Sequence, residues 1–195
     1  QLAICYAREK RIDDAKRVFD AFAQAHAEDP LFAPTVEQLA DAAYVGGDTA
    51  WSEELFAKLA EGGADPKMSV SGLSGLGWSQ FKSGKLEDAA ATFDKLLQRE
   101  PPPEMAAEAT LVRGRILEEL DQPEAALAMY QQLIDNYPDS PQHASGLLAA
   151  ARLHHKLQQN EQAEALYAKL VESYPELPKL DTALYEWSWV LEDLG

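Results

Sequence analysis

The sequence predicts an all-α fold, a solenoid of helix–turn–helix repeats in which each repeat is an antiparallel pair of helices. Three observations predict this fold. A set of marker residues recurs every 37 residues along the chain. Within each copy, apolar residues fall at the spacing of a helix face, and a glycine or polar residue separates two such stretches. Because a single helix pair could not bury its apolar face, successive pairs must stack on one another.

The clearest copy of the repeat lies at residues 76–101. Gly77 lies in its first helix, Gly84 forms the turn, and Ala89 and Phe93 share a face of its second helix. The second-helix markers of the five copies are the small residues Ala15, Ser52, Ala89, Ala126 and Ala163, the aromatic residues Phe19, Phe56, Phe93, Tyr130 and Tyr167, and the apolar residues Phe22, Leu59, Leu96, Leu133 and Leu170. The first-helix markers are Leu2-Ala3, Leu39-Ala40, Leu76-Gly77, Arg113-Gly114, Ala150-Ala151 and Trp187-Ser188, and the turn positions are Lys10, Gly47, Gly84, Asp121, Gln158 and Gly195.

Proline and glycine mark where the expected helices begin and end. The first pair is expected at residues 1–9 and 12–27, and Pro34 suits the first turn of the next helix. Gly62-Gly63 is expected to form a left-handed helix cap after the second pair. The remaining helices are expected at residues 35–45 and 49–61, within 76–101, and at 103–119, 123–136, 142–157, 161–173 and 180–194.

The repeat resembles the tetratricopeptide family, whose units of ~34 residues carry a Leu-Gly pair, a small residue, an aromatic residue and a closing proline. Leu76-Gly77, Ala89, Phe93 and Pro101 match that pattern, and the resemblance covers nearly the whole chain. It implies a right-handed superhelical array over residues 1–195, with a concave and a convex side. We expect repeats at 1–32, 33–69, 70–106, 107–143 and 144–180 and a lone first helix at 181–195, as a segment of a longer parent chain.

The repeat is longer than the family norm, and the extra residues fall around Tyr137-Pro138 and Tyr174-Pro175. This connection resembles the variant found in bacterial envelope proteins, including outer-membrane assembly lipoproteins and partners of the Tol–Pal system. The resemblance implies a bacterial protein and favours the periplasm or cell envelope over the cytoplasm.

Composition excludes several classes of partner. The net charge is −16 and no basic block exists, so we expect no nucleic-acid binding and no attraction to anionic membranes. No apolar run approaches the ~20 residues that span a bilayer, so we expect no direct membrane insertion. Cys5 is the only cysteine, which excludes an intramolecular disulfide, and we expect it to be a small buried apolar residue.

No group of residues has the pattern of a catalytic site. His154 and His155 are adjacent on a helix and cannot both face one metal ion. Neighbouring carboxylates on a helix point in diverging directions and do not share a proton. Three such pairs occur, at Asp13-Asp14, Glu53-Glu54 and Glu118-Glu119. We therefore predict a protein that is not an enzyme and has no cofactor or metal site.

The side of each first helix opposite its packing residues is the candidate binding surface. In the tetratricopeptide family this face lines the concave groove and takes an extended peptide or a partner's helix. The candidate protein-binding residues are Tyr44, Trp78, Phe81, Lys82, Arg115, Arg152, His155, Lys156, Tyr185 and Trp189. Because exposed aromatic residues beside arginine are typical of interaction hot spots, we predict a scaffold for a protein or peptide with apolar and acidic side chains.

Three alternatives stay open. The aromatic residues of this face could pack against neighbouring helices instead. The array could self-associate through its terminal helix, where Trp187 and Leu191 occupy core positions. It could also regulate an enzyme elsewhere in the parent chain. The carboxylate clamp that grips chaperone C-termini is not expected, since its lysine position holds Glu37, Ser74, Leu111 and Leu148.

Overall fold

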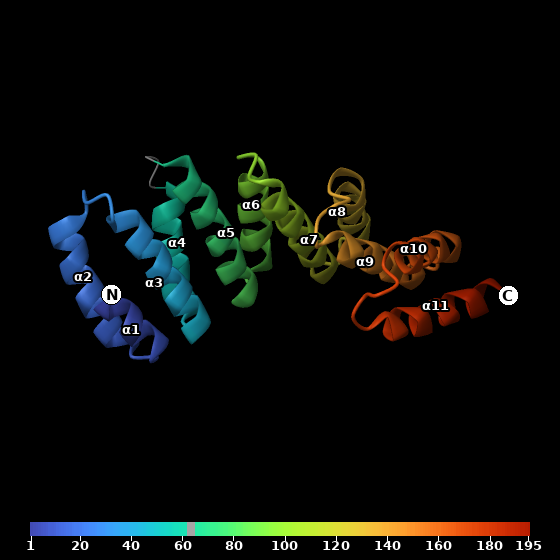
Figure 1. Cartoon of the computed structure of the whole chain (residues 1–195), viewed down its shortest axis with the longest axis horizontal. Helices are drawn as coiled ribbons and strands as arrows, with labels where there is room; N and C mark the ends of the chain where they lie inside the picture. Colours follow the sequence, from blue (N-terminus) through green and yellow to red (C-terminus); the bar gives the residue numbers. More distant parts are fainter. Residues whose placement is uncertain (62–64) are drawn as a thin grey trace. The chain divides into compact units, whose positions relative to one another are not determined.

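The computed structural model describes residues 1–61 and 65–195, and over these residues it contains eleven α-helices and no β-strand (Figure 1). The chain divides into two compact units, residues 1–101 and 102–195. Unit 1 contains α1 (Leu2–Arg8), α2 (Ile12–His26), α3 (Phe32–Gly46), α4 (Thr49–Glu61), α5 (Pro66–Lys82) and α6 (Leu86–Leu97). Unit 2 contains α7 (Pro103–Glu119), α8 (Pro123–Asn136), α9 (His143–Lys156), α10 (Asn160–Ser173) and α11 (Leu180–Leu194). The predicted all-α repeat fold is confirmed.

The turn inside each helix pair has the same backbone geometry at the same register. The residue at the turn position has a positive φ angle, between 57° and 92°, in all five pairs. The next N–H donates to the carbonyl five residues earlier at 2.8–3.0 Å, which is the Schellman closure of a helix end. The five turn residues are Lys10, Gly47, Gly84, Asp121 and Gln158. The 37-residue register is therefore a backbone repeat as well as a side-chain one.

The marker residues of the second helices form the core of each unit. The five small markers have no exposed surface, and the five aromatic markers are at most 3% exposed. A Cβ atom added to Gly77 would lie 2.9 Å from the ring of Phe93, and one added to Gly114 would lie 2.3 Å from the ring of Tyr130. A glycine therefore stands in the first helix where the aromatic ring of the paired helix presses on its backbone.

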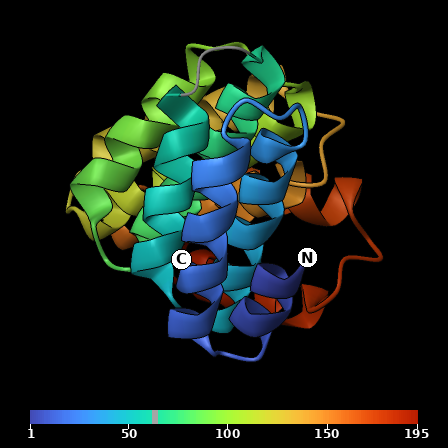
Figure 2. The same ribbon diagram turned by 90° about the vertical axis from the view of Figure 1, so that its left-hand side faces the viewer.

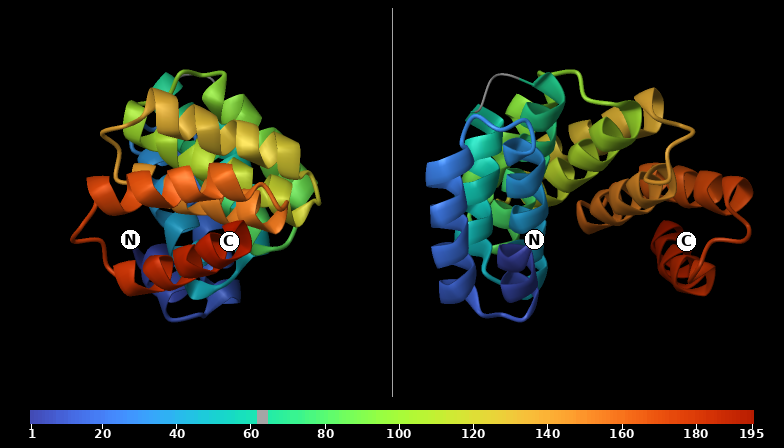
Figure 3. Two further views of the ribbon diagram at one scale, coloured as in Figure 1. Left: turned by 90° about the vertical axis from the view of Figure 1, so that its right-hand side faces the viewer. Right: turned by 60° about the vertical axis from the view of Figure 1, so that its left-hand side comes forward.

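Within each unit the first helices form one layer and the second helices the other. In unit 1, α1 packs on α3 and α3 on α5, whereas the described residues of α2, α4 and α6 make no close backbone contact with one another (Figure 2). In unit 2, α7 packs on α9 and α9 on α11, while α8 packs against α7 and α9, and α10 packs against α9 and α11 (Figure 3). We call the exposed side of each first-helix layer the first-helix face.

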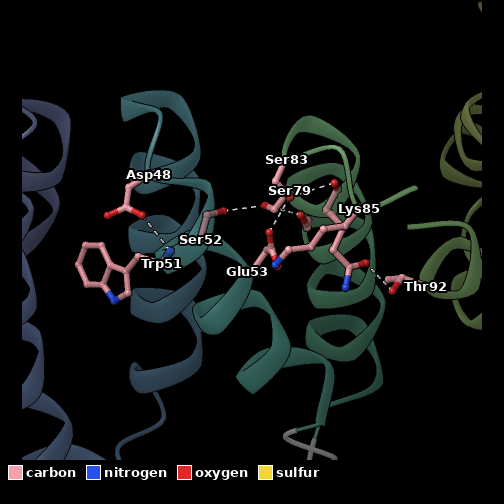
Figure 4. Close-up of polar contacts among 10 residues, drawn as sticks. Asp48, Trp51, Ser52, Glu53, Ser79, Ser83, Lys85 and Thr92 are labelled. Carbon is pink, nitrogen blue, oxygen red and sulfur yellow. Dashed lines mark hydrogen bonds and ion pairs between the residues drawn. The ribbon is translucent and has the colours of Figure 1, made fainter. Parts of the chain in front are cut away.

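Polar contacts join consecutive repeats inside unit 1. Glu53 on α4 accepts hydrogen bonds from Lys85 at 2.7 Å and from Ser83 at 2.8 Å (Figure 4). In the interior, the hydroxyl oxygens of Ser52 on α4 and Ser79 on α5 lie 2.8 Å apart (Figure 4). These contacts fix the second helix of one repeat against the next repeat.

Three details differ from the sequence-based expectation or lie outside it. Cys5 is exposed, so the prediction that it is buried is wrong. The buried face of α1 consists of Ala3, Ile4 and Ala7, and Cys5 points ~100° away from Ile4. The α3 helix begins at Phe32, earlier than the expected start at residue 35. The expectation that Pro34 lies in its first turn, where a missing N–H costs nothing, is confirmed. The expected cap at 62–63 lies outside the described residues.

Candidate functional site

The candidate residues of unit 1 are largely engaged in contacts within that unit. The Lys82 ammonium lies 4.1 Å from the centroid of the Tyr44 ring and donates to the Tyr44 carbonyl at 2.9 Å. Trp78 packs edge-on against Phe81 and against the buried Phe93, with ring centroids 6.0 and 6.1 Å apart. Trp78 and Phe81 are only partly exposed. In this unit the aromatic residues serve packing within the unit.

An arginine–glutamate clasp joins α9 to α11 on the first-helix face of unit 2. Arg152 donates from Nε and Nη2 to the two carboxylate oxygens of Glu186, each at 2.7 Å. The Tyr167 hydroxyl donates to the same carboxylate at 3.2 Å. The bond to Glu186 raises the pKa of Arg152, and burial together with the Glu186 charge raises the pKa of Tyr167. Two donors thus converge on one carboxylate.

Beside this clasp, α11 exposes a pair of aromatic side chains. Tyr185 is 60% exposed and Trp189 is 47% exposed, and their ring centroids lie 4.7 Å apart. His155 Nε2 lies 2.8 Å from a carboxylate oxygen of Asp193, which ties the end of α9 to α11. Lys156 is exposed on α9. The predicted aromatic and basic residues of α9 and α11 therefore lie on one surface and remain accessible.

Arg115 lines a small cavity between α7 and α9. The cavity has a volume of about 200 Å³ and is lined by Arg115, Glu118, Tyr130, Ser145, Leu148, Ala149 and Arg152. The Tyr130 hydroxyl donates to Glu118 inside it. Burial, then this hydrogen bond, raises the pKa of Tyr130. Arg115 itself has no ion pair in the part of the chain that the structure describes.

The carboxylate pairs and the histidine pair act separately. Glu53 binds Lys85 while Glu54 binds Lys58. Asp14 lies between Arg11 and Arg17, whose hydrogen bonds lower the pKa of Asp14. His154 Nδ1 lies 2.6 Å from the Gln159 side-chain oxygen, whereas His155 contacts Asp193. Residues 1–61 and 65–195 contain no group of three or more His, Cys, Asp or Glu side chains placed to hold a metal ion.

None of the helices that the structure describes has the length and hydropathy required to span a bilayer.

Sequence reasoning missed Glu186 and Tyr167 as parts of this surface. Tyr167 was recognised only as a core marker, because its ring carries the repeat pattern while its hydroxyl reaches the surface carboxylate. Glu186 is not part of the repeat pattern, because the preceding repeat has alanine, Ala149, at the same position. The one available signal was its spacing of 34 residues from Arg152, and that spacing has meaning only once the stacking of consecutive first helices is known.

Comparisons with known structures concern proteins built from similar helix pairs. BtubC (BKLC) from P. vanneervenii is 18% identical with a TM-score of 0.71, over 96% of this chain and 84% of that protein. A tetratricopeptide repeat protein from Parabacteroides merdae is 16% identical with a TM-score of 0.70, over 99% and 75% of the two chains. A thermophilic TPR protein from Thermus thermophilus is 20% identical with a TM-score of 0.57, over 97% and 95%. At these identities the likeness concerns the fold.

The sequence itself identifies the family. No curated protein matches the chain significantly. The family model described as tetratricopeptide repeat matches residues 74–141 and 119–178, which together cover more than half of the chain. The matched residues include three of the five buried small markers, three of the five buried aromatic markers and three of the five left-handed turns described above. The chain therefore belongs to the tetratricopeptide repeat family.

Proposed function

We propose that this chain is a non-enzymatic scaffold that binds a peptide segment or helix of another protein on the first-helix face of unit 2. The tetratricopeptide fold generally serves protein–protein interaction, which supports the class of function. The observation that carries the proposal is the exposed Tyr185–Trp189 pair beside Arg152 and Lys156. Aromatic side chains next to arginine supply the apolar area and the charge-assisted hydrogen bonds of binding hot spots.

Unit 2 is preferred over unit 1 because of what its side chains already contact. In unit 1, the Lys82 ammonium is engaged by Tyr44, and the Trp78 ring packs on Phe93. In unit 2, the Tyr185 and Trp189 rings contact each other and leave about half of their surface in solvent. Exposed aromatic area is what a partner can bury, so the larger share of binding energy is assigned to α11.

Peptide display on the purified chain tests this proposal. Random twelve-residue peptides would be selected on the wild-type chain, and their affinities would be measured by fluorescence anisotropy. Y185A and W189A are expected to weaken the selected peptides by about tenfold or more. L184A and L191A are matched controls, since these leucines are similarly exposed on another face of α11 and should leave affinity unchanged. Peptides whose affinity is insensitive to Y185A and W189A, in variants with wild-type circular dichroism, would refute the proposal.

A second candidate function is self-association through α11. Leu184, Leu191 and Leu194 are 43%, 48% and 41% exposed, which favours contact with another apolar surface. If α11 mediates self-association, the expected effects of the two pairs of variants are exchanged. L184A and L191A would lower the weight-average mass at high concentration, while Y185A and W189A would not. Sedimentation equilibrium over a hundredfold concentration range decides between the two, because a monomer at all concentrations excludes self-association.

The bacterial envelope is the proposed compartment. Its support is the Tyr-Pro connection, which recurs at the ends of α8 and α10, where Tyr137 and Tyr174 follow the last helical residue with φ angles of −132° and −134°. Fractionation of cells that produce the parent protein tests this. Recovery with periplasmic or membrane markers is expected, and recovery with cytoplasmic markers would exclude it.

A further inference from the structure

Side-chain contacts between consecutive first helices occur at two fixed spacings. At a spacing of 34 residues, Ser71 donates to Glu37 between α5 and α3, and Arg152 donates to Glu186 between α9 and α11. At a spacing of 38 residues, Lys82 donates to the Tyr44 carbonyl, and His155 contacts Asp193. The α3–α5 and α9–α11 junctions therefore each have one contact at the 34-residue spacing and one at the 38-residue spacing. The spacings follow from stacking equivalent helices one repeat apart.

The junction between α7 and α9 has neither contact among the residues that the structure describes. One repeat before Arg152 and Glu186, the equivalent residues are Arg115 and Ala149. Arg115 is thus in the position of Arg152, but a methyl group stands where Glu186 supplies its carboxylate. Both Arg115 and Ala149 line the cavity of about 200 Å³ described above. The missing carboxylate leaves space on the first-helix face.

The α9–α11 junction shows what such a position binds. There, the guanidinium of Arg152 and the hydroxyl of Tyr167 donate to the two oxygens of one carboxylate. Tyr130 is the equivalent of Tyr167 and lines the same cavity as Arg115, and its hydroxyl donates to Glu118. The planar guanidinium matches a carboxylate with two parallel hydrogen bonds, a geometry that a point charge such as lysine does not offer.

One group in the cavity opposes an incoming anion. Glu118 carries a carboxylate and accepts the Tyr130 hydroxyl. It is not within ion-pair distance of Arg115 in the described structure, so it lowers the affinity of the cavity for an anion without occupying the guanidinium. Ser145, which also lines the cavity, adds a hydroxyl that can donate to a bound oxygen.

We propose that the cavity between α7 and α9 is a carboxylate subsite, in which a carboxylate of the bound partner takes the place against Arg115 that Glu186 holds against Arg152. This inference rests on the proposed peptide-binding function and names the chemistry of the partner. The carboxylate comes from an Asp or Glu side chain or from a peptide C-terminus. The apolar part of the same partner lies on Tyr185 and Trp189.

The test follows the arginine Nε–Hε signals of the ¹⁵N-labelled chain by NMR at constant ionic strength. Three probes are titrated: N-acetylglutamic acid α-amide carries a side-chain carboxylate, N-acetyl-Ala-Ala carries a terminal one, and N-acetylglutamine amide carries none. The Arg115 signal is expected to shift saturably with a carboxylate probe and not with the neutral one. The carboxylate probe that binds more tightly identifies whether the partner's carboxylate comes from a side chain or from a C-terminus. Arg8, which is exposed, is the control for unspecific ion pairing and should show no saturation.

Two variants make the test specific. A149E provides an internal carboxylate one repeat before Glu186 and is expected to weaken the probe at least tenfold. E118Q removes the opposing charge and is expected to tighten it about threefold. An Arg115 signal that does not saturate, that responds equally to the neutral probe, or that keeps wild-type affinity in A149E overturns the subsite. This outcome can be separated from that of the proposed function. If Y185A and W189A weaken peptide binding while the Arg115 signal does not respond to the carboxylate probes, only the subsite is refuted.

Discussion

The hydroxyl groups of Ser52 and Ser79 form a directed hydrogen bond in the interior of unit 1. Both side chains are fully buried, and their oxygens lie 2.8 Å apart (Figure 4). Ser79 Oγ also lies 2.8 Å from the Gly75 carbonyl, to which it donates its single proton. The proton between the two hydroxyl groups must therefore come from Ser52. Ser79 is both donor and acceptor, and Ser52 is the donor.

This direction predicts an asymmetry between two alanine substitutions. S79A removes the acceptor and leaves the Ser52 hydroxyl buried without a partner, which should lower the free energy of unfolding by about 1–3 kcal/mol. S52A leaves Ser79 bonded to Gly75, and the other four repeats carry alanine at this position, so it should change stability by less than about 0.5 kcal/mol. Urea unfolding followed by circular dichroism measures both. Equal losses would show that the hydroxyl of Ser52 has another acceptor.

Substitution of Gly114 by alanine is expected to destabilise unit 2. The added Cβ would lie 2.3 Å from the fully buried ring of Tyr130, which cannot move aside in a packed interior. Overpacking costs about 1–3 kcal/mol, and the helix propensity of alanine returns at most about 1 kcal/mol. G146A is the matched control, because its Cβ meets the flexible end of Leu133 at 2.7 Å. A G114A variant as stable as G146A would contradict the close approach.

The left-handed turn residues provide a third prediction. Gln158 has a φ of 59°, a conformation that costs a residue with a Cβ about 1–2 kcal/mol, and glycine adopts it freely. Q158G should therefore stabilise the chain by about 0.5–1 kcal/mol after the entropy of glycine in the unfolded chain is deducted. D121G should gain less, since aspartate tolerates this region better.

The reverse substitution is the control for the turn. Gly84 has a φ of 78°, and a Cβ added there meets nothing within 4 Å. G84A should thus lose about 1 kcal/mol through its backbone alone. Thermal unfolding midpoints of the three variants check the series, and a destabilised Q158G would mean that the glutamine side chain makes a compensating contact.

The fold could be predicted from the sequence because its core is the same set of contacts repeated five times. The small, aromatic and turn markers each carry one packing requirement, and their register gave the bounds of α4, α7, α8 and α11 to the residue. Where a marker position carries a different type of residue, the sequence predicts the packing of that residue less well. Phe22 takes the place of a buried leucine, but it is only partly buried and stacks on Phe32 and His26 instead.

The candidate surface was less predictable for a physical reason. Helical periodicity shows which side of a helix a residue lies on, but not what the neighbouring helix brings to it. Trp78 and Tyr185 lie on comparable faces, yet Trp78 is partly covered by Phe81 and Phe93, while Tyr185 is 60% exposed. The pairing of Arg152 with Glu186 depends on the offset between consecutive helix pairs, which no single repeat encodes.

His143 makes unit 2 sensitive to mild acid. It is buried at the start of α9, and its Nδ1 lies within hydrogen-bond distance, 2.6 Å, of the Tyr174 hydroxyl oxygen. Burial, followed by the charge of Lys169, lowers the pKa of His143, although the Ile134 carbonyl and Asp139 act in the opposite direction. Below pH 6.5 the unfolded chain therefore binds a proton that the folded chain does not, and stability falls as the pH decreases through this range.

The wild-type chain should thus lose more stability between about pH 7.5 and about pH 5 than H143Q, which cannot titrate at this position. The difference between the two losses should lie between about 0.5 and 2 kcal/mol, the upper value applying if the folded ring stays neutral throughout. Urea unfolding at both pH values, analysed as a double difference, removes the contribution of all other titrating groups. H154Q is the matched control, since the Nδ1 of His154 hydrogen-bonds the Gln159 side chain near the surface, and this variant should behave as the wild type. Equal losses in wild type and H143Q would show that the buried ring accepts a proton at no cost to the fold.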